Sequence, residues 1–182
     1  MAAAAMQQQH GASLTGAWVL DVARSESMAP YLHLLDVPLA HIPAQLELEQ
    51  VVPSRNVIVL NEGVLTLYKR TAVNHFTEAL ELGVEKVFQA PNSGIIKRVT
   101  ASLINDDELS GYVYAGNTVV PGGCNVSVVD ARRLEPGGES HTQTLTVQNN
   151  ATGERCTIRR TWVRVPMSRN DLQRLGGRAV GE

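Results

Sequence analysis

The chain has 182 residues, of which 43% are hydrophobic and 19% charged, with a formal net charge of −2 and a pI near 6.2. This composition indicates one globular domain and argues against a nucleic-acid surface, which would need a strongly basic face. No apolar run approaches the roughly 18 residues of a membrane-spanning helix. Only eight residues are Phe, Trp or Tyr, so the core must be mainly aliphatic.

The N-terminal residues are low in complexity and lack the basic start and long apolar run of a signal peptide. We therefore expect residues 1–13 to form a flexible tail. Cys124 and Cys156 show no metal-ligand spacing, and unpaired cysteines favour a reducing, cytoplasmic setting. The histidines show no metal-ligand spacing either, so we expect no metal and no cofactor.

The first two predicted elements differ in the spacing of their apolar residues, and no linker separates them. Residues 14–23 read as a strand that contains Gly16-Ala17-Trp18, and from residue 25 the apolar residues take helical spacing. The apolar face of this first helix consists of Met28, Tyr31, Leu32 and Leu35. The stretch 39–52 stays open: its alternating leucines fit a strand, whereas Pro43 near its start fits the first turn of a helix.

From residue 56 onward, turn signals separate short runs rich in Val, Ile, Leu, Thr and Tyr, which is typical of consecutive antiparallel hairpins. The predicted strands are 56–60, 64–71, 75–82, 84–90, 94–103, 110–116, 125–133, 141–148 and 155–165. A meander of about ten strands is expected to close on itself, which removes its exposed edges. The predicted fold is all-β: a ten-stranded antiparallel up-and-down β-barrel, with a short two-helix lid between the first and second strands.

This barrel is expected to span residues 14–165. The remaining residues, 166–182, form a C-terminal extension in which SRNDLQRLGG predicts a short helix. Its cap would be Ser168 or Asn170, and Gly176 would follow its end.

Several short motifs are shared with one protein family. They are Gly16-Ala17-Trp18, SESMAPYLHLLDV at 25–37, NEGVLTL at 61–67, the pairs within 77–85, and Arg160-Thr161-Trp162. Over residues 14–165 the chain thereby resembles the intracellular lipid-binding proteins, also called fatty-acid-binding proteins, of the calycin superfamily. It departs from them in having Asp36 in place of the glycine that ends the first helix and Trp162 in place of a tyrosine.

The resemblance implies a site. In that family the last strand's arginine holds a lipid carboxylate, a role that falls here to Arg160, with the indole N–H of Trp162 replacing the tyrosine hydroxyl. A second inward arginine is expected on strand 125–133, where either Arg132 or Arg133 could serve. Trp18 is expected to close the bottom of the barrel beneath Arg164.

Strand parity supports part of this picture. Residues two apart share a face, so Arg160 lies on the same face as Trp162 and opposite Arg159. An indole belongs in the interior, which brings Arg160 inside with it. A buried guanidinium is costly unless paired, so Arg160 needs a carboxylate from a ligand or from the protein.

The function expected is that of a non-catalytic, monomeric, cytoplasmic carrier of a long-chain fatty acid or another hydrophobic small molecule. Its expected ligand contacts are Arg160, Trp162, Arg132, Met28, Tyr31, Leu32 and Leu35. One alternative is a calycin-barrel enzyme acting on a lipid-like substrate, with Glu78 or Glu81 as the acid–base group. The other is a barrel filled by its own side chains that serves as an interaction module and lacks a void of roughly 300 Å³.

Overall fold

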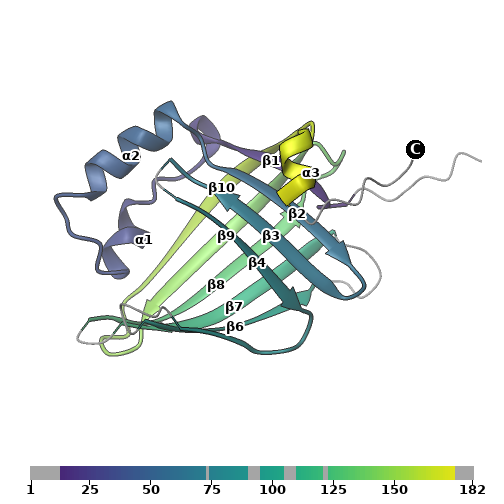
Figure 1. Cartoon of the computed structure of the whole chain (residues 1–182). Helices are drawn as coiled ribbons and strands as arrows, with labels where there is room; N and C mark the ends of the chain where they lie inside the picture. The colour runs from purple at the N-terminus through teal and green to yellow at the C-terminus, as the bar shows by residue number, and fades with distance from the viewer. Residues whose placement is uncertain (1–12, 73, 90–94, 105–109, 121–122, 175–182) are drawn as a thin grey trace, which may run out of the picture.

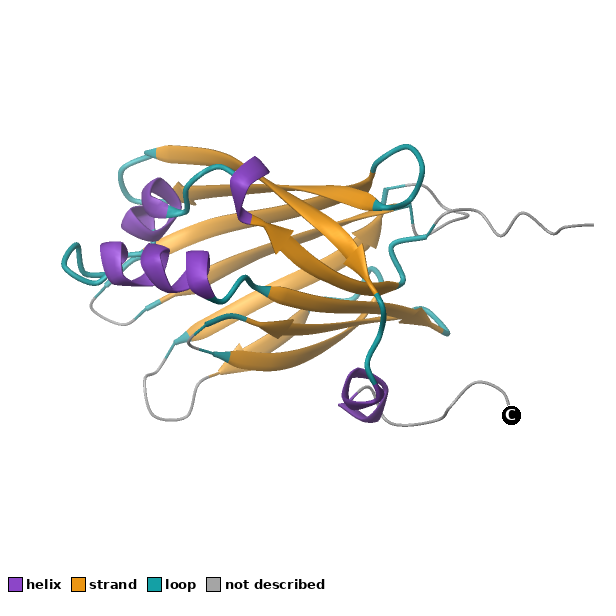
Figure 2. Cartoon of the chain, turned by 90° about the horizontal axis from the view of Figure 1, so that it is seen from above, coloured by secondary structure: helices purple, strands orange, loops and turns teal. Residues whose placement is uncertain are grey.

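A computed structural model describes residues 13–72, 74–89, 95–104, 110–120 and 123–174. Ten antiparallel strands form one sheet that curls into a nearly closed barrel, and two helices between β1 and β2 lie at one end of it (Figure 1; Figure 2). The strands are β1 (Gly16–Asp21), β2 (Arg55–Asn61), β3 (Val64–Arg70), β4 (His75–Glu81), β5 (Lys86–Gln89), β6 (Ile96–Leu103), β7 (Gly111–Val119), β8 (Asn125–Leu134), β9 (Ser140–Asn149) and β10 (Arg155–Val165). The predicted fold class is confirmed.

The strand order is β4-β3-β2-β1-β10-β9-β8-β7-β6-β5. Strands consecutive in sequence pair with each other, except that β4 and β5 are the two edges of the sheet, and β1 pairs with β10. The two edges approach each other where the Gly83 N–H donates to the Ala101 carbonyl of β6 at 2.8 Å. Every predicted strand is present, although β7 continues to Val119 and β5 is shorter than expected. The turn signals of the sequence at 91–94 and 105–108 lie outside the described residues, as do the first two residues of the turn signal at 121–123.

The two lid helices are α1 (Ala29–Leu34) and α2 (Ile42–Val51), joined to β1 through a 3-10 turn, η1 (Val22–Arg24). Each α-helix has a proline in its first turn, where the missing N–H costs nothing. Pro30 explains why α1 begins at residue 29 rather than near 25. The helical interpretation of 39–52 is correct over α2. Asp36 follows α1 with φ of 57°, the left-handed conformation that explains the family's glycine there.

An arginine and an indole close the end of the barrel opposite the lid. The Arg164 Cζ lies 4.2 Å from the centroid of the Trp18 ring, and its guanidinium donates to the carbonyls of Ser13, Thr15 and Gly138. Trp18 is fully buried, and its N–H donates to the Leu14 carbonyl. The expected contact between Arg164 and Trp18 is confirmed.

The C-terminal extension contains the helix α3 (Arg169–Arg174). Ser168 caps it, since the Ser168 Oγ accepts from the Asp171 N–H and Asp171 accepts from the Ser168 N–H in return. Asp171 also binds Arg55 of β2 at 2.6 Å, which fastens the extension to the barrel. Of the two predicted caps, Ser168 is correct, while Gly176 lies outside the described residues.

His141 is fully buried between the rings of Trp18 and Trp162, and neither of its nitrogens has a hydrogen-bond partner in the part of the chain that the structure describes. Burial, and secondarily the charge of Arg132, lowers the pKa of His141 to about 2. The unfolded chain binds a proton at this histidine below pH ~6.5, whereas the folded chain does not. As the pH is lowered from about 6.5 towards 2, the free energy of unfolding therefore decreases by about 1.4 kcal/mol per pH unit.

We expect the protein to lose about 2 kcal/mol of stability between pH 6.5 and pH 5, above the range in which carboxylates titrate. In His141→Phe this slope should disappear, whereas the exposed-site control His75→Gln should keep it. Urea unfolding at a series of pH values measures both. Parallel slopes in the wild type and His141→Phe would contradict the assignment.

Candidate functional site

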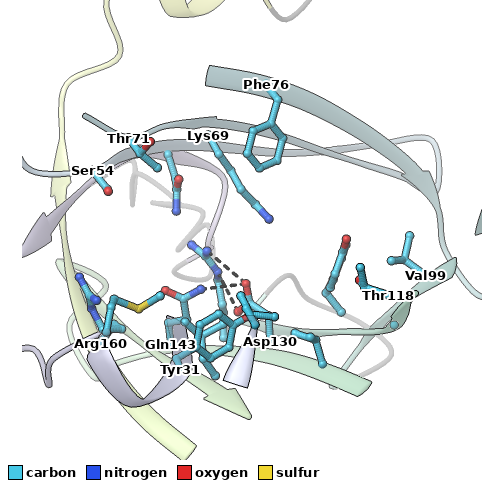
Figure 3. Close-up of a pocket in the computed structure, with 18 of the residues that line it drawn as sticks. Tyr31, Ser54, Lys69, Thr71, Phe76, Val99, Thr118, Asp130, Gln143 and Arg160 are labelled. Atoms are coloured by element: carbon cyan, nitrogen blue, oxygen red, sulfur yellow. Dashed lines mark hydrogen bonds and ion pairs between the residues drawn. The ribbon is translucent and has the colours of Figure 1, made fainter. Parts of the chain in front are cut away.

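A cavity of about 420 Å³ lies inside the barrel beneath the lid (Figure 3). Its wall comes from α1, α2 and all strands except β1 and β5. A second cavity of about 520 Å³ adjoins it between the lid and the turn that joins β3 to β4, and the two share several residues of their walls, among them Met28, Tyr31 and Glu49. The space under the lid thus adjoins the barrel interior and shares part of its wall.

The lid residues singled out from the sequence divide between the two cavities. Met28, Tyr31 and Leu35 line both, whereas Leu32 lines only the outer one among the lining residues described. The residue of α1 that is buried most deeply is Leu34, which packs into a core cluster with residues of β8 and β9. Sequence periodicity missed Leu34 because a helix of six residues is too short to define one buried face.

Arg160 points into the cavity from β10, as strand parity predicted, and only 3% of it is exposed. Its Nη2 lies 2.8 Å from the Glu49 Oε2 of α2. Its Nε and Nη1 are buried without a partner among the described residues. Arg159, its neighbour in sequence, faces outward and is exposed. The lid therefore supplies the carboxylate that Arg160 was expected to need, and this carboxylate contacts one of the three guanidinium nitrogens.

Arg132, and not Arg133, is the second inward arginine. Its Nε and Nη2 donate to the two oxygens of Asp130 at 3.3 and 3.4 Å, and the Gln143 amide donates to Asp130 at 2.8 Å. The Trp162 indole N–H, expected to meet a ligand, donates to the Gln143 Oε1 at 2.8 Å. These four side chains form one buried network beside Arg160 (Figure 3).

Register explains why the network forms where it does. Gln143 of β9 pairs with Arg132 on one side and with Arg160 on the other, so three inward polar residues stand in a row across β8, β9 and β10. Sequence reasoning missed Gln143 and Asp130. The signal was present, because Gln143 alternates with Leu145 and Val147 on one face of its strand.

A second polar cluster lies on the opposite wall. The buried carboxylate of Glu78 binds Lys97 at 2.6 Å and Lys69 at 3.5 Å. The Tyr114 hydroxyl lies 3.5 Å from the same carboxylate. Burial raises the pKa of Glu78, but the two lysines outweigh it and hold this pKa below its ordinary value. Glu78 is thus a charged partner of lysines, and Glu81, the other acid–base candidate, is exposed.

Two kinds of site are missing from the part of the chain that the structure describes. No group of three or more His, Cys, Asp or Glu side chains is arranged to hold a metal ion. None of the described helices combines the length and the hydropathy needed to cross a membrane.

The barrel, its lid and the inward polar rows define the chain structurally as a member of the fold of the fatty-acid-binding proteins. Neither a protein-family model nor a curated protein matches the sequence. Solved structures do match. A structure described as the REP1-NXSQ fatty acid transporter superposes with a TM-score of 0.61 at 14% identity and covers 85% of this chain and 98% of its own.

Two further structures agree. Lipid binding protein 8 of Caenorhabditis elegans matches with a TM-score of 0.61 and 18% identity, over 83% of this chain and 94% of its own. A Schistosoma mansoni fatty acid binding protein in complex with arachidonic acid matches with a TM-score of 0.57 and 16% identity, over 85% and 99%. The predicted resemblance is confirmed at the level of the fold.

The pairing of Asp130 with Arg132 generates a stability prediction. Asp130→Asn keeps the shape of the side chain but leaves a buried guanidinium without its charge partner, which costs about 3–5 kcal/mol in the free energy of unfolding. The double variant Asp130→Asn/Arg132→Met should recover most of that loss. Urea denaturation measures both, with the exposed Arg133→Met as the control that changes little. A loss below about 1 kcal/mol in Asp130→Asn would contradict the pairing.

Proposed function

We propose that this protein is a non-catalytic carrier that binds one fatty acid, or a similar long-chain carboxylic acid, inside the barrel. The observation that carries the proposal is the cavity of about 420 Å³ that Arg160 lines, with its buried Nε and Nη1 lacking a partner among the described residues. The two free cysteines, Cys124 and Cys156, fit a reducing compartment such as the cytoplasm.

The size of the cavity supports a hydrophobic ligand. It lies within the range of about 300–1,000 Å³ that is usual for small-molecule sites. Transfer of about fifteen methylenes from water contributes roughly 12 kcal/mol in gross terms. Ordering and association costs reduce this figure but leave a useful affinity. The same cavity argues against the interaction module, which needs a barrel filled by its own side chains.

The geometry at Arg160 suggests how a ligand carboxylate is accommodated. A guanidinium holds a carboxylate side by side through two nitrogens, and Nη2 belongs to both of the edges that allow this. Glu49 occupies Nη2. A ligand carboxylate that binds side by side shares Nη2 with Glu49, and two carboxylates so close repel each other. We therefore propose that the ligand replaces Glu49, which sits on α2 and can move outward with the lid. One carboxylate exchanges for another, and the interior keeps its charge balance.

The polar groups fit binding better than acid–base catalysis. A general base works best with a pKa near the operating pH. Lys69 and Lys97 move the pKa of Glu78 in the other direction, and its carboxylate is already bound at 2.6 Å. We therefore propose that Glu78 organises the lysines and takes no part in a reaction, and that the barrel carries no enzymatic activity.

Displacement of a fluorescent long-chain fatty acid by palmitate tests the proposal. Delipidated protein should bind the probe saturably at micromolar concentration. Arg160→Ala removes charge-assisted hydrogen bonds worth about 1.5–3 kcal/mol each, so palmitate should bind roughly 10- to 100-fold more weakly. Arg159→Ala, which changes an exposed side chain, is the matched control and should bind like the wild type. The absence of saturable binding to the wild type would refute the carrier function.

The exchange at Arg160 yields a second binding prediction. Glu49→Gln removes the internal competitor, so palmitate should bind about tenfold more tightly while hexadecanol, which carries no charge, gains little. Amides of α2 should also exchange faster with solvent, because a buried ion pair to β10 is lost. Glu47→Gln, an exposed position on the same helix, is the control. Weaker palmitate binding in Glu49→Gln would show that Glu49 assists the ligand instead of competing with it.

A further inference from the structure

The distribution of lysines in this chain is uneven. Of its sixteen basic residues only three are lysines, namely Lys69, Lys86 and Lys97, and the other thirteen are arginines. Two of the three line the cavity, while Lys86 is exposed on β5. Arginine is the usual residue for a buried ion pair, since its fork matches a carboxylate and its charge is permanent. A lysine at these positions supplies something that arginine cannot: an amine able to lose its proton.

The two cavity lysines are not equivalent. Lys97 holds Glu78 at 2.6 Å, which leaves Lys69 with a contact of 3.5 Å to the same carboxylate. The Lys69 Nζ instead lies 5.4 Å from the ring centroid of Phe76 and 5.1 Å from that of Tyr114. Figure 3 shows Lys69 extending from its strand into the open space beside Phe76. Its amine therefore meets the cavity, against two aromatic faces.

The surroundings make the ammonium of Lys69 lose its proton more easily than that of an exposed lysine. Burial lowers its pKa, and the charges of Arg132 and Lys97 act in the same direction, against the opposing pull of Asp130 and Glu78. A desolvated lysine beside another cation is a recognised arrangement for an amine that attacks carbonyl carbon.

We propose that Lys69 is a covalent binding site for long-chain aldehydes, which it holds as an imine. The inference rests on the proposed function in one respect, because the cavity must admit a hydrophobic chain. The neutral Nζ adds to the aldehyde carbon, and the two hydrogens of the amine leave with the carbonyl oxygen as water. A C=N bond replaces the C=O bond, and no oxidant or reductant takes part.

Lys97 is the proton carrier for this step. Its Nζ lies 5.0 Å from the same Tyr114 ring, and Glu78 fixes it in place. It donates a proton to the departing hydroxyl of the carbinolamine and regains one from the nitrogen, so that it ends unchanged. Glu78 then lies beside the neutral imine, on the side where it contacted Lys69, and is the counter-ion of the iminium that forms when the nitrogen takes up a proton.

The test is to trap the imine. The full-length protein is incubated with dodecanal and sodium cyanoborohydride at pH 7, and adducts are located by intact mass and peptide mapping. Because the chain offers only three lysine amines and its N-terminus, each adduct can be assigned. We expect one dodecyl group, at Lys69, formed about tenfold faster than any adduct at the exposed Lys86. Excess palmitate should suppress the Lys69 adduct and leave that at Lys86 unchanged.

Lys69→Arg keeps the cation and removes the reactive amine, so it should lose the fast adduct. Lys86→Arg should retain the fast adduct. Modification of Lys69 no faster than that of Lys86 overturns the proposal, and if palmitate still displaces the probe, the carrier function survives it. Failure of both the adduct and the displacement overturns the two together.

Discussion

A guanidinium cannot remain inside a barrel without an anionic partner, and in this protein the partner of Arg160 comes from the lid. The bond from its Nη2 to Glu49 joins the last strand to the second lid helix, elements far apart in the sequence. Desolvation makes such a bond costly to form and costlier to break on one side. The position of α2 over the barrel is therefore coupled, through this ion pair, to the presence of an anion beside Arg160 in the cavity.

The rest of the interior follows the same requirement. Arg132 is matched by Asp130, and Lys97 by Glu78, so each inward cation on the barrel wall has a carboxylate within reach. Gln143 links one of these pairs to Trp162. The polar groups thus occupy fixed positions on two walls, and the space between them stays open because charged and hydrogen-bonded side chains do not collapse onto each other as an aliphatic core does.

At the opposite end the barrel is closed by aromatic packing. Trp18 lies beneath the Arg164 guanidinium and against His141. Each of the three nitrogens of that guanidinium donates to a backbone carbonyl of the N-terminal segment or of the β8–β9 turn. His141 remains neutral because its site excludes water and faces Arg132. Among the described residues, the outer cavity lies between the lid and the β3–β4 turn, at the end of the barrel away from Trp18.

The sequence by itself determined the strands, their order and the inward face of β10, because alternation of period two and hairpin turns are local properties. It also determined that Arg160 would be buried and would need a carboxylate. The sequence did not determine which carboxylate pairs with Arg160, or that Arg132 rather than Arg133 turns inward. Both were decided only when β8, β9 and β10 came into register and α2 folded over them. The pairing of Glu49 with Arg160, and the closer contact of Glu78 with Lys97 than with Lys69, depend on residues distant in the chain. No local pattern records the distances on which charge pairing depends.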